Sequence, residues 1–175
     1  MEDAIALIDK IIEEHKTIFQ RLRDFEQIAN DAEALTGFDK AKELFVPGRL
    51  ESKKGLVAFA EVLGTITEGM HSHFGREEGA LMKVFREHGD KKLSSALHSL
   101  LLEHEDLKHR LASTKQDVAT LQDGKLPNQI WQAHAHDMRA YITYTRKLFE
   151  AHAGLEQELF RSLRSDLMKA AERNK

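Results

Sequence analysis

Cysteine is absent from the 175 residues, and proline occurs only twice, as Pro47 and Pro127. The absence of cysteine excludes a disulfide framework, a thiolate zinc site and a cysteine-ligated iron–sulfur cluster, and it agrees with a reducing compartment. The scarcity of proline and of β-branched runs removes the usual interruptions of helices. We therefore expect a protein built of long helices.

A long apolar run and a surplus of positive charge are missing as well. No apolar run reaches the length of a membrane span, and the N-terminal segment "MEDAIALIDKIIEEH" lacks the basic start and the small-residue cleavage site of a signal peptide. The net charge is -3 with acids and bases interleaved, so no basic stripe is available for phosphate backbones. We expect a cytoplasmic protein with no membrane and no nucleic-acid partner.

The composition is that of an ordinary globular protein, with 41% hydrophobic and 31% charged residues, and the length suits one domain over residues 1–175. Breaks that contain glycine or proline fall at residues 35–40, 45–52, 87–92 and 122–129. The helices between these breaks are expected over residues 3–33, 53–88, 91–122 and 128–172, with a short extra helix or long loop around "KAKELF" (residues 40–45). This pattern predicts an all-α, antiparallel up-down-up-down four-helix bundle.

Polar residues interrupt the inward face of every helix, where apolar residues should recur at alternating steps of three and four. The interruption is His15 in the first helix and His104 in the third. The second and fourth helices carry a histidine with a glutamate one turn later, as His73 with Glu77 and His152 with Glu156. The apolar positions of these faces include Ile8 and Leu22 in the first helix, Leu63 and Val84 in the second, Leu97 and Leu111 in the third, and Tyr141, Leu148, Leu155 and Leu159 in the fourth.

The interrupted faces belong to an internal repeat. "HFGREEGAL" (73–81) and "HAGLEQELF" (152–160) share the order His, any residue, Gly, any residue, Glu. "EEHKTIFQRL" (13–22) aligns in the same way with "LEHEDLKHRL" (102–111), so the chain reads as two helix pairs of one design. All four histidines lie near the midpoints of their helices, and antiparallel packing should therefore bring them to one level of the bundle.

The residue types at this level point to a pair of metal ions. Imidazoles and carboxylates suit iron, manganese or zinc, and an inward carboxylate can bridge two cations. We assign His15 and His73 to one metal and His104 and His152 to the other, with Glu77 and Glu156 as bridges. Without cations, two buried carboxylates would each cost several kcal/mol or take up protons. With a shared oxo or hydroxo group, each metal has five ligands and octahedral iron keeps one open position.

The remaining polar residues have simpler expected roles. His71, His98, His109 and His136 fall off the inward faces and should be solvated. His88 caps a helix end, and His134 lies about 27 Å along its helix from His152, too far to reach the metals. Gly75 and Gly154, in mid-helix, indicate space for a close backbone approach or a small ligand beside the metals. Glu14 and Glu103, each next to an inward histidine, either orient ligands or are simply solvated.

The order of these six residues resembles that of the hemerythrin-like family, the HHE cation-binding domain. The likeness covers nearly the whole chain and rests on "EEHKTIFQRL", "HFGREEGALM", "LLEHEDLKHRL" and "HAGLEQELF". The resemblance implies a non-haem centre of two iron ions, oxo- or hydroxo-bridged, in a four-helix bundle, with zinc or manganese as other metals such ligands accept. It also implies a small gaseous or anionic ligand as the partner of the metals.

Two departures from the oxygen carriers of that family count against a dedicated oxygen carrier. Lys108 stands where those proteins have a further histidine one turn after the third-helix histidine, and their last carboxylate is an aspartate one residue further on. We therefore expect a protein that binds or senses dioxygen or nitric oxide, or handles iron. The alternative is a di-iron oxidoreductase that reduces peroxide, dioxygen or nitric oxide, and a metal-free interaction bundle is the third reading. No catalytic residue is assigned.

Overall fold

The computed structural model describes residues 1–41 and 48–173. Its elements are α1 (Glu2–Ala41), α2 (Gly48–Arg76), the π-helix η1 (Glu77–Leu81), α3 (Met82–His88), α4 (Lys91–Leu101), α5 (Glu103–Gln122) and α6 (Asn128–Arg173). Because α2, η1 and α3 follow one another without a gap, they form one rod, and α4 with α5 form another. The described residues therefore make four helical rods.

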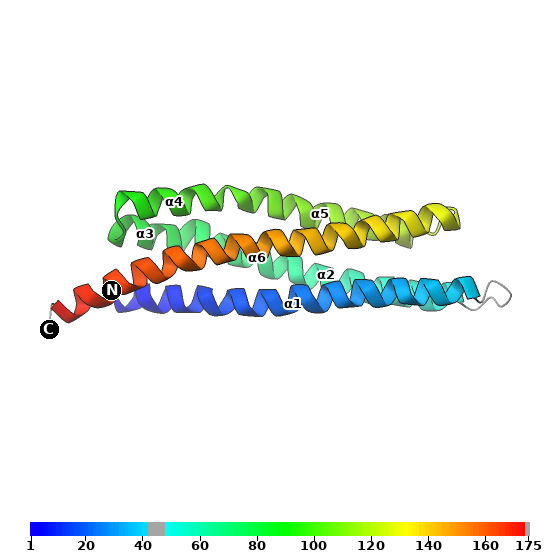
Figure 1. Cartoon of the computed structure of the whole chain (residues 1–175), viewed down its shortest axis with the longest axis horizontal. Helices are drawn as coiled ribbons and strands as arrows, with labels where there is room; N and C mark the ends of the chain where they lie inside the picture. The colour runs from blue at the N-terminus through cyan, green and yellow to red at the C-terminus, as the bar shows by residue number, and fades with distance from the viewer. Residues whose placement is uncertain (42–47, 174–175) are drawn as a thin grey trace.

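The rods form an antiparallel bundle. α1 contacts α2 and α6, and α5 contacts the same two helices from the other side. The chain runs to one end of the bundle in α1, returns in α2, runs out again in α4 and α5, and returns in α6, so both termini lie at the same end (Figure 1). This arrangement confirms the predicted all-α, up-down-up-down four-helix bundle.

Some predicted helix boundaries were wrong at the first connection. α1 continues through residues 35–40 to Ala41, and the second rod begins at Gly48 rather than at residue 53. A glycine inside a helix costs only about 1 kcal/mol relative to alanine, so Gly37 does not end α1. The short extra helix or loop expected around residues 40–45 falls on the end of α1 and otherwise lies outside the described residues.

The other two connections follow the predicted signals. The carboxylate of Asp90 caps α4 by accepting a hydrogen bond from the backbone nitrogen of Leu93 at 2.7 Å. Between α5 and α6, Gly124 has a φ of 68°, a left-handed conformation that glycine adopts without strain and that lets the chain turn back. Among the described helices, none is long and apolar enough to cross a membrane.

The core consists of two apolar clusters with a polar layer between them. The larger cluster, on the side of the connection between α5 and α6, includes Leu22, Phe59, Leu111 and Ile142. The smaller one, on the side of the termini, includes Ile8, Leu81, Leu97 and Leu163. The interrupted positions of the inward faces lie between these clusters, at mid-length of the rods.

The inward face of α6 differs from the predicted one. Tyr141, Leu148 and Leu159 are half-buried and Leu155 is 52% exposed, whereas Ile142, Phe149, Ala153 and Phe160 are buried. The buried positions Ile142, Phe149, Glu156 and Leu163 recur at steps of seven, so the predicted heptad spacing holds along α6. Only the position within the heptad was wrong, because Tyr141, Leu148 and Leu155 each precede an inward residue by one.

The π-helix η1 changes the register of the second rod. From His73 onward the buried positions advance by fours, through Glu77 and Leu81 to Phe85. In an α-helix each step of four turns about 40° beyond a full turn, so three steps would carry the face about 120° away from the core. The π turn over Glu77–Leu81 contains more residues per turn than an α-helix, so it rotates less per residue and returns the buried positions to the core side. As a consequence Phe85 is fully buried, whereas Val84, the predicted core position, is only half-buried.

Candidate metal centre

The six predicted metal ligands meet in the polar layer between the two apolar clusters. Each of the four rods supplies at least one of them, and none is more than 2% exposed. They are His15 from α1, His73 from α2, Glu77 from η1, His104 from α5, and His152 and Glu156 from α6. The structure therefore brings together residues that are separated by up to 141 positions, as the pair His15 and Glu156 shows.

The glutamate of the second rod lies between two pairs of histidines. Oε1 of Glu77 is 3.2 Å from Nε2 of His15 and 3.2 Å from Nε2 of His73. Its other oxygen, Oε2, is 3.4 Å from Nε2 of His104. One carboxylate thus has one oxygen beside the His15–His73 pair and one beside the His104–His152 pair.

Glu156 repeats this arrangement from the opposite side. Its Oε1 is 3.3 Å from Nε2 of His152 and 3.7 Å from Nε2 of His104, and its Oε2 is 3.4 Å from Nε2 of His15. Two groups of donors result, and the atoms within each group lie within 4.8 Å of one another. These groups are His15, His73 and Glu77, and His104, His152 and Glu156.

The inward polar atoms are largely without hydrogen-bond partners. Nε2 of His15, Nε2 of His73 and all four carboxylate oxygens of Glu77 and Glu156 are buried and accept or donate no hydrogen bond within the described part of the chain. Buried polar atoms are nearly always paired in folded proteins, because an unpaired one costs about 1–3 kcal/mol. Imidazole and carboxylate donors suit iron, manganese and zinc, so this set of atoms fits a pair of such cations.

Each histidine turns Nε2 inward and Nδ1 toward a polar partner on another rod. Glu14 lies 3.0 Å from Nδ1 of His73, and Glu103 lies 3.0 Å from Nδ1 of His152. Metal-binding histidines usually donate their second N–H to such a group, which fixes the ring and its tautomer. Of the two readings of Glu14 and Glu103, the structure supports orientation of the histidines over plain solvation.

Two further partners of the histidine Nδ1 atoms, which we call outer partners together with Glu14 and Glu103, were not predicted from the sequence. Glu78 lies 2.9 Å from Nδ1 of His104, and the side-chain amide of Gln157 lies 3.5 Å from Nδ1 of His15. Each directly follows an inward glutamate in the sequence, which is the signal that could have identified them. Residues next to an inward position on a helix point sideways, toward the neighbouring rods.

Cations contact two of the outer carboxylates. Arg76 donates from Nε and Nη2 to Glu14 at 3.0 and 2.9 Å. Lys108 donates to Glu78 at 3.0 Å and to Glu105 at 2.9 Å. From the sequence, Lys108 was expected beside the metals, one turn after His104. Its ammonium group instead contacts Glu78 on the Nδ1 side of His104, because this position on the helix faces the boundary with the second rod.

The buried charges shift the pKa values of the central groups. Burial lowers the pKa of His15, but the carboxylates of Glu156 and Glu77, 3.4 and 3.2 Å from its Nε2, outweigh this effect and raise the pKa to about 9. Burial, with the repulsion of His15, lowers the pKa of His73 to about 4 despite its hydrogen bond to Glu14. Without cations, the centre therefore holds a proton on His15.

The two central carboxylates shift in opposite directions. Burial, with the charge of Glu156, raises the pKa of Glu77 to about 7. Burial also acts to raise the pKa of Glu156, but the imidazoles around it outweigh this effect and lower the pKa. Cations would compete with protons for the same atoms, since a histidine or carboxylate must be deprotonated to bind a metal.

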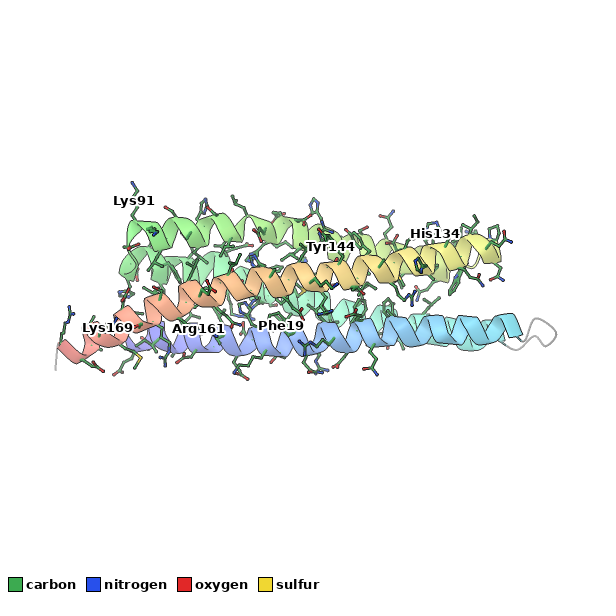
Figure 2. The ribbon with its side chains drawn as sticks, in the orientation of Figure 1. Phe19, Lys91, His134, Tyr144, Arg161 and Lys169 are labelled. Carbon is green, nitrogen blue, oxygen red and sulfur yellow. The ribbon has the colours of Figure 1, made fainter. Side chains whose placement is uncertain are left out.

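The other histidines lie away from the centre, as predicted. His71, His88, His98, His109, His134 and His136 are all exposed. His134 lies toward the start of α6, far along the bundle from Phe19, whose ring lies 6.4 Å from that of His15 (Figure 2). The expectation for the glycines was wrong: Gly75 and Gly154 are exposed, and a side chain at either would meet no atom within 4 Å.

The chain matches a model of a known protein family. The family model described as "Hemerythrin HHE cation binding domain" matches residues 6–163, which include all six central residues. No curated protein and no solved structure matches the chain. The match covers most of the chain and agrees with the helical bundle and the paired His/Glu groups. The chain belongs to the hemerythrin family of HHE cation-binding domains.

Proposed function

We propose that the six central residues hold two iron ions, one on the His15–His73 pair and one on the His104–His152 pair. The observation that carries this proposal is that Glu77 and Glu156 each direct one oxygen to each pair. A carboxylate in that position can bind two cations at once, which a site for a single metal would not require. Zinc and manganese accept the same donors, and membership of the hemerythrin family favours iron.

We infer further that the protein binds or senses dioxygen or nitric oxide, or handles iron, in the cytoplasm. Two imidazole nitrogens and two carboxylate oxygens for each iron leave coordination positions that an external ligand can take. The rings of Phe149 and Phe160 lie 6.2 and 5.9 Å from that of His15, and Phe74 stacks on His104 at 4.0 Å. These apolar rings exclude water and favour a small, weakly polar ligand over a charged one. Bound iron would supply the electrons and the open positions.

One observation favours the alternative of a di-iron oxidoreductase. The side chain of Glu103 is 56% exposed and also lies 3.0 Å from Nδ1 of His152. It therefore connects a central imidazole to solvent. Reduction of dioxygen, peroxide or nitric oxide consumes protons, and such a carboxylate offers them a path to the centre.

The two functions differ in what the reduced protein does with nitric oxide or dioxygen. We expect anaerobic ferrous protein to bind up to two nitric oxide molecules per chain, and the adduct to persist when a reductant is added. His98→Ala, which replaces an exposed histidine, should behave like the wild type. Steady consumption of the gas with the reductant would instead establish the oxidoreductase. A protein that takes up no iron under these conditions would contradict both and leave the metal-free bundle.

A further inference from the structure

The two halves of the centre are built from equivalent residues with one chemical difference. In the internal repeat, Glu14 corresponds to Glu103, and Glu78 corresponds to Gln157. Glu14 and Glu103 make equivalent contacts, each 3.0 Å from Nδ1 of a histidine on the neighbouring rod. The second correspondence pairs a carboxylate with a neutral amide.

This difference places unequal hydrogen-bond partners behind the two pairs. His104 and His152 are both backed by carboxylates, from Glu78 at 2.9 Å and Glu103 at 3.0 Å. In the other pair only His73 has a carboxylate partner, and His15 has the amide of Gln157 at 3.5 Å. A carboxylate forms a stronger, charge-assisted hydrogen bond than an amide. It thereby raises the electron-donating power of the imidazole at Nε2.

The charged residues that surround the two histidine pairs also differ, in the same direction as the hydrogen-bond partners. Behind the His15–His73 pair, the carboxylate of Glu14 is balanced by the guanidinium of Arg76, which donates two hydrogen bonds to it. Behind the His104–His152 pair, Lys108 balances Glu78, whereas the described contacts of Glu103 include no cation. The second pair therefore has one more negative charge behind its imidazoles than the first.

We propose that Glu78 and Gln157 make the two metal positions inequivalent, so that the His104–His152 position favours the ferric ion and the His15–His73 position favours the ferrous ion. This inference rests on the proposed two-iron centre. When an external one-electron oxidant takes one electron from the ferrous protein, the electron leaves the iron on the His104–His152 pair first. The product has one ferric and one ferrous ion in fixed places, and a second electron leaves at a higher potential.

The residues named give a reciprocal test. Gln157→Glu adds a carboxylate behind His15 and should lower the potential of the second oxidation step while leaving the first in place. Glu78→Gln removes the carboxylate behind His104 and should raise the potential of the first step. Each change brings the two potentials closer, and the double swap should separate them again. A tenfold change in the preference for the ferric ion corresponds to about 59 mV for one electron, and outer partners typically change metal affinity by roughly 10–100-fold.

The iron content of every variant is determined first. The two potentials are then measured by anaerobic potentiometric titration of the two-iron protein with ferricyanide as the oxidant, and Mössbauer spectroscopy gives the amounts of ferric and ferrous iron at each step. The control is Glu158→Gln, which changes an exposed carboxylate on the same helix as Gln157 and should shift neither potential. The inference is overturned if Gln157→Glu moves neither step, if it lowers the first step instead, or if Glu158→Gln shifts a step equally. Fewer than two irons per wild-type chain would contradict the proposed two-iron centre itself. That result differs from the three outcomes that overturn only the inequivalence of the two positions.

Discussion

At the scale of single residues, His15 is the central group whose proton a metal has to displace. Its pKa rises from 6.5 in the unfolded chain to about 9 in the folded protein. A raised pKa means that the folded state binds the proton more tightly, so the resulting stability is present below about pH 6.5 and is lost as the pH rises through 9. Glu77, whose pKa is about 7, acts in the same direction at lower pH.

We therefore predict that the free energy of unfolding of the metal-free protein decreases from pH 7 to pH 9, by at most about 1.4 kcal/mol per pH unit for one proton. Urea denaturation of protein treated with a chelator would measure it, and His15→Gln should remove most of this dependence. The metal-loaded protein should change little over the same interval, because a bound metal keeps His15 deprotonated in the folded state and the unfolded chain is also deprotonated there above pH 6.5. A metal-free protein with equal stability at pH 7 and pH 9 would contradict the raised pKa of His15.

At the scale of the elements, the π-helix η1 decides which side chain of α3 enters the core. Phe85 is fully buried in the cluster on the side of the termini, and Val84 is only half-buried at its edge. We predict that Phe85→Ala destabilises the fold by about 3–5 kcal/mol. Val84→Ala should cost about 1 kcal/mol, because less apolar surface is buried there. The two free energies come from denaturant unfolding, and a larger loss for Val84→Ala would mean that the second rod is an uninterrupted α-helix.

The sequence predicted the elements well where a strong local signal exists. Asp90 and Pro127 mark the starts of α4 and α6, and both helices begin beside them. The errors came from features that depend on tertiary structure. In α6 the stripe through Tyr141, Leu148 and Leu155 has the same heptad spacing as the buried stripe one residue further on, and only tertiary packing selects between them. The π-helix η1 has no distinct composition that would predict a π turn.

The candidate site was predictable for a different reason. Imidazoles and carboxylates on faces that are otherwise apolar stand out in the sequence, and the repeat supplies two copies of the pattern. All six inward residues were found in this way, and the structure brings them to one level. Glu78, Gln157 and Arg76 were not found, because half-exposed polar residues on a helix are common and only the packing of neighbouring rods shows what they contact.

At the scale of the whole molecule, the polar layer divides the core and joins all four rods at mid-length. The apolar clusters on either side hold the rods together, while the layer itself contains buried carboxylate oxygens without hydrogen-bond partners in the described chain. Such a layer weakens a bundle unless cations neutralise it. The architecture therefore makes sense as a scaffold that holds two cations, and the central claim is the number of metal ions that it binds.

The most direct test of that claim is the metal content of each chain after anaerobic loading with ferrous iron and removal of the excess. We predict two irons per chain for the wild type and for His71→Ala and His98→Ala, which change exposed histidines. Glu77→Ala and Glu156→Ala should each lose at least one iron, because each removes an oxygen from both positions. A wild-type chain that retains fewer than two irons, or an equal loss from the exposed and the central variants, would contradict the two-metal centre.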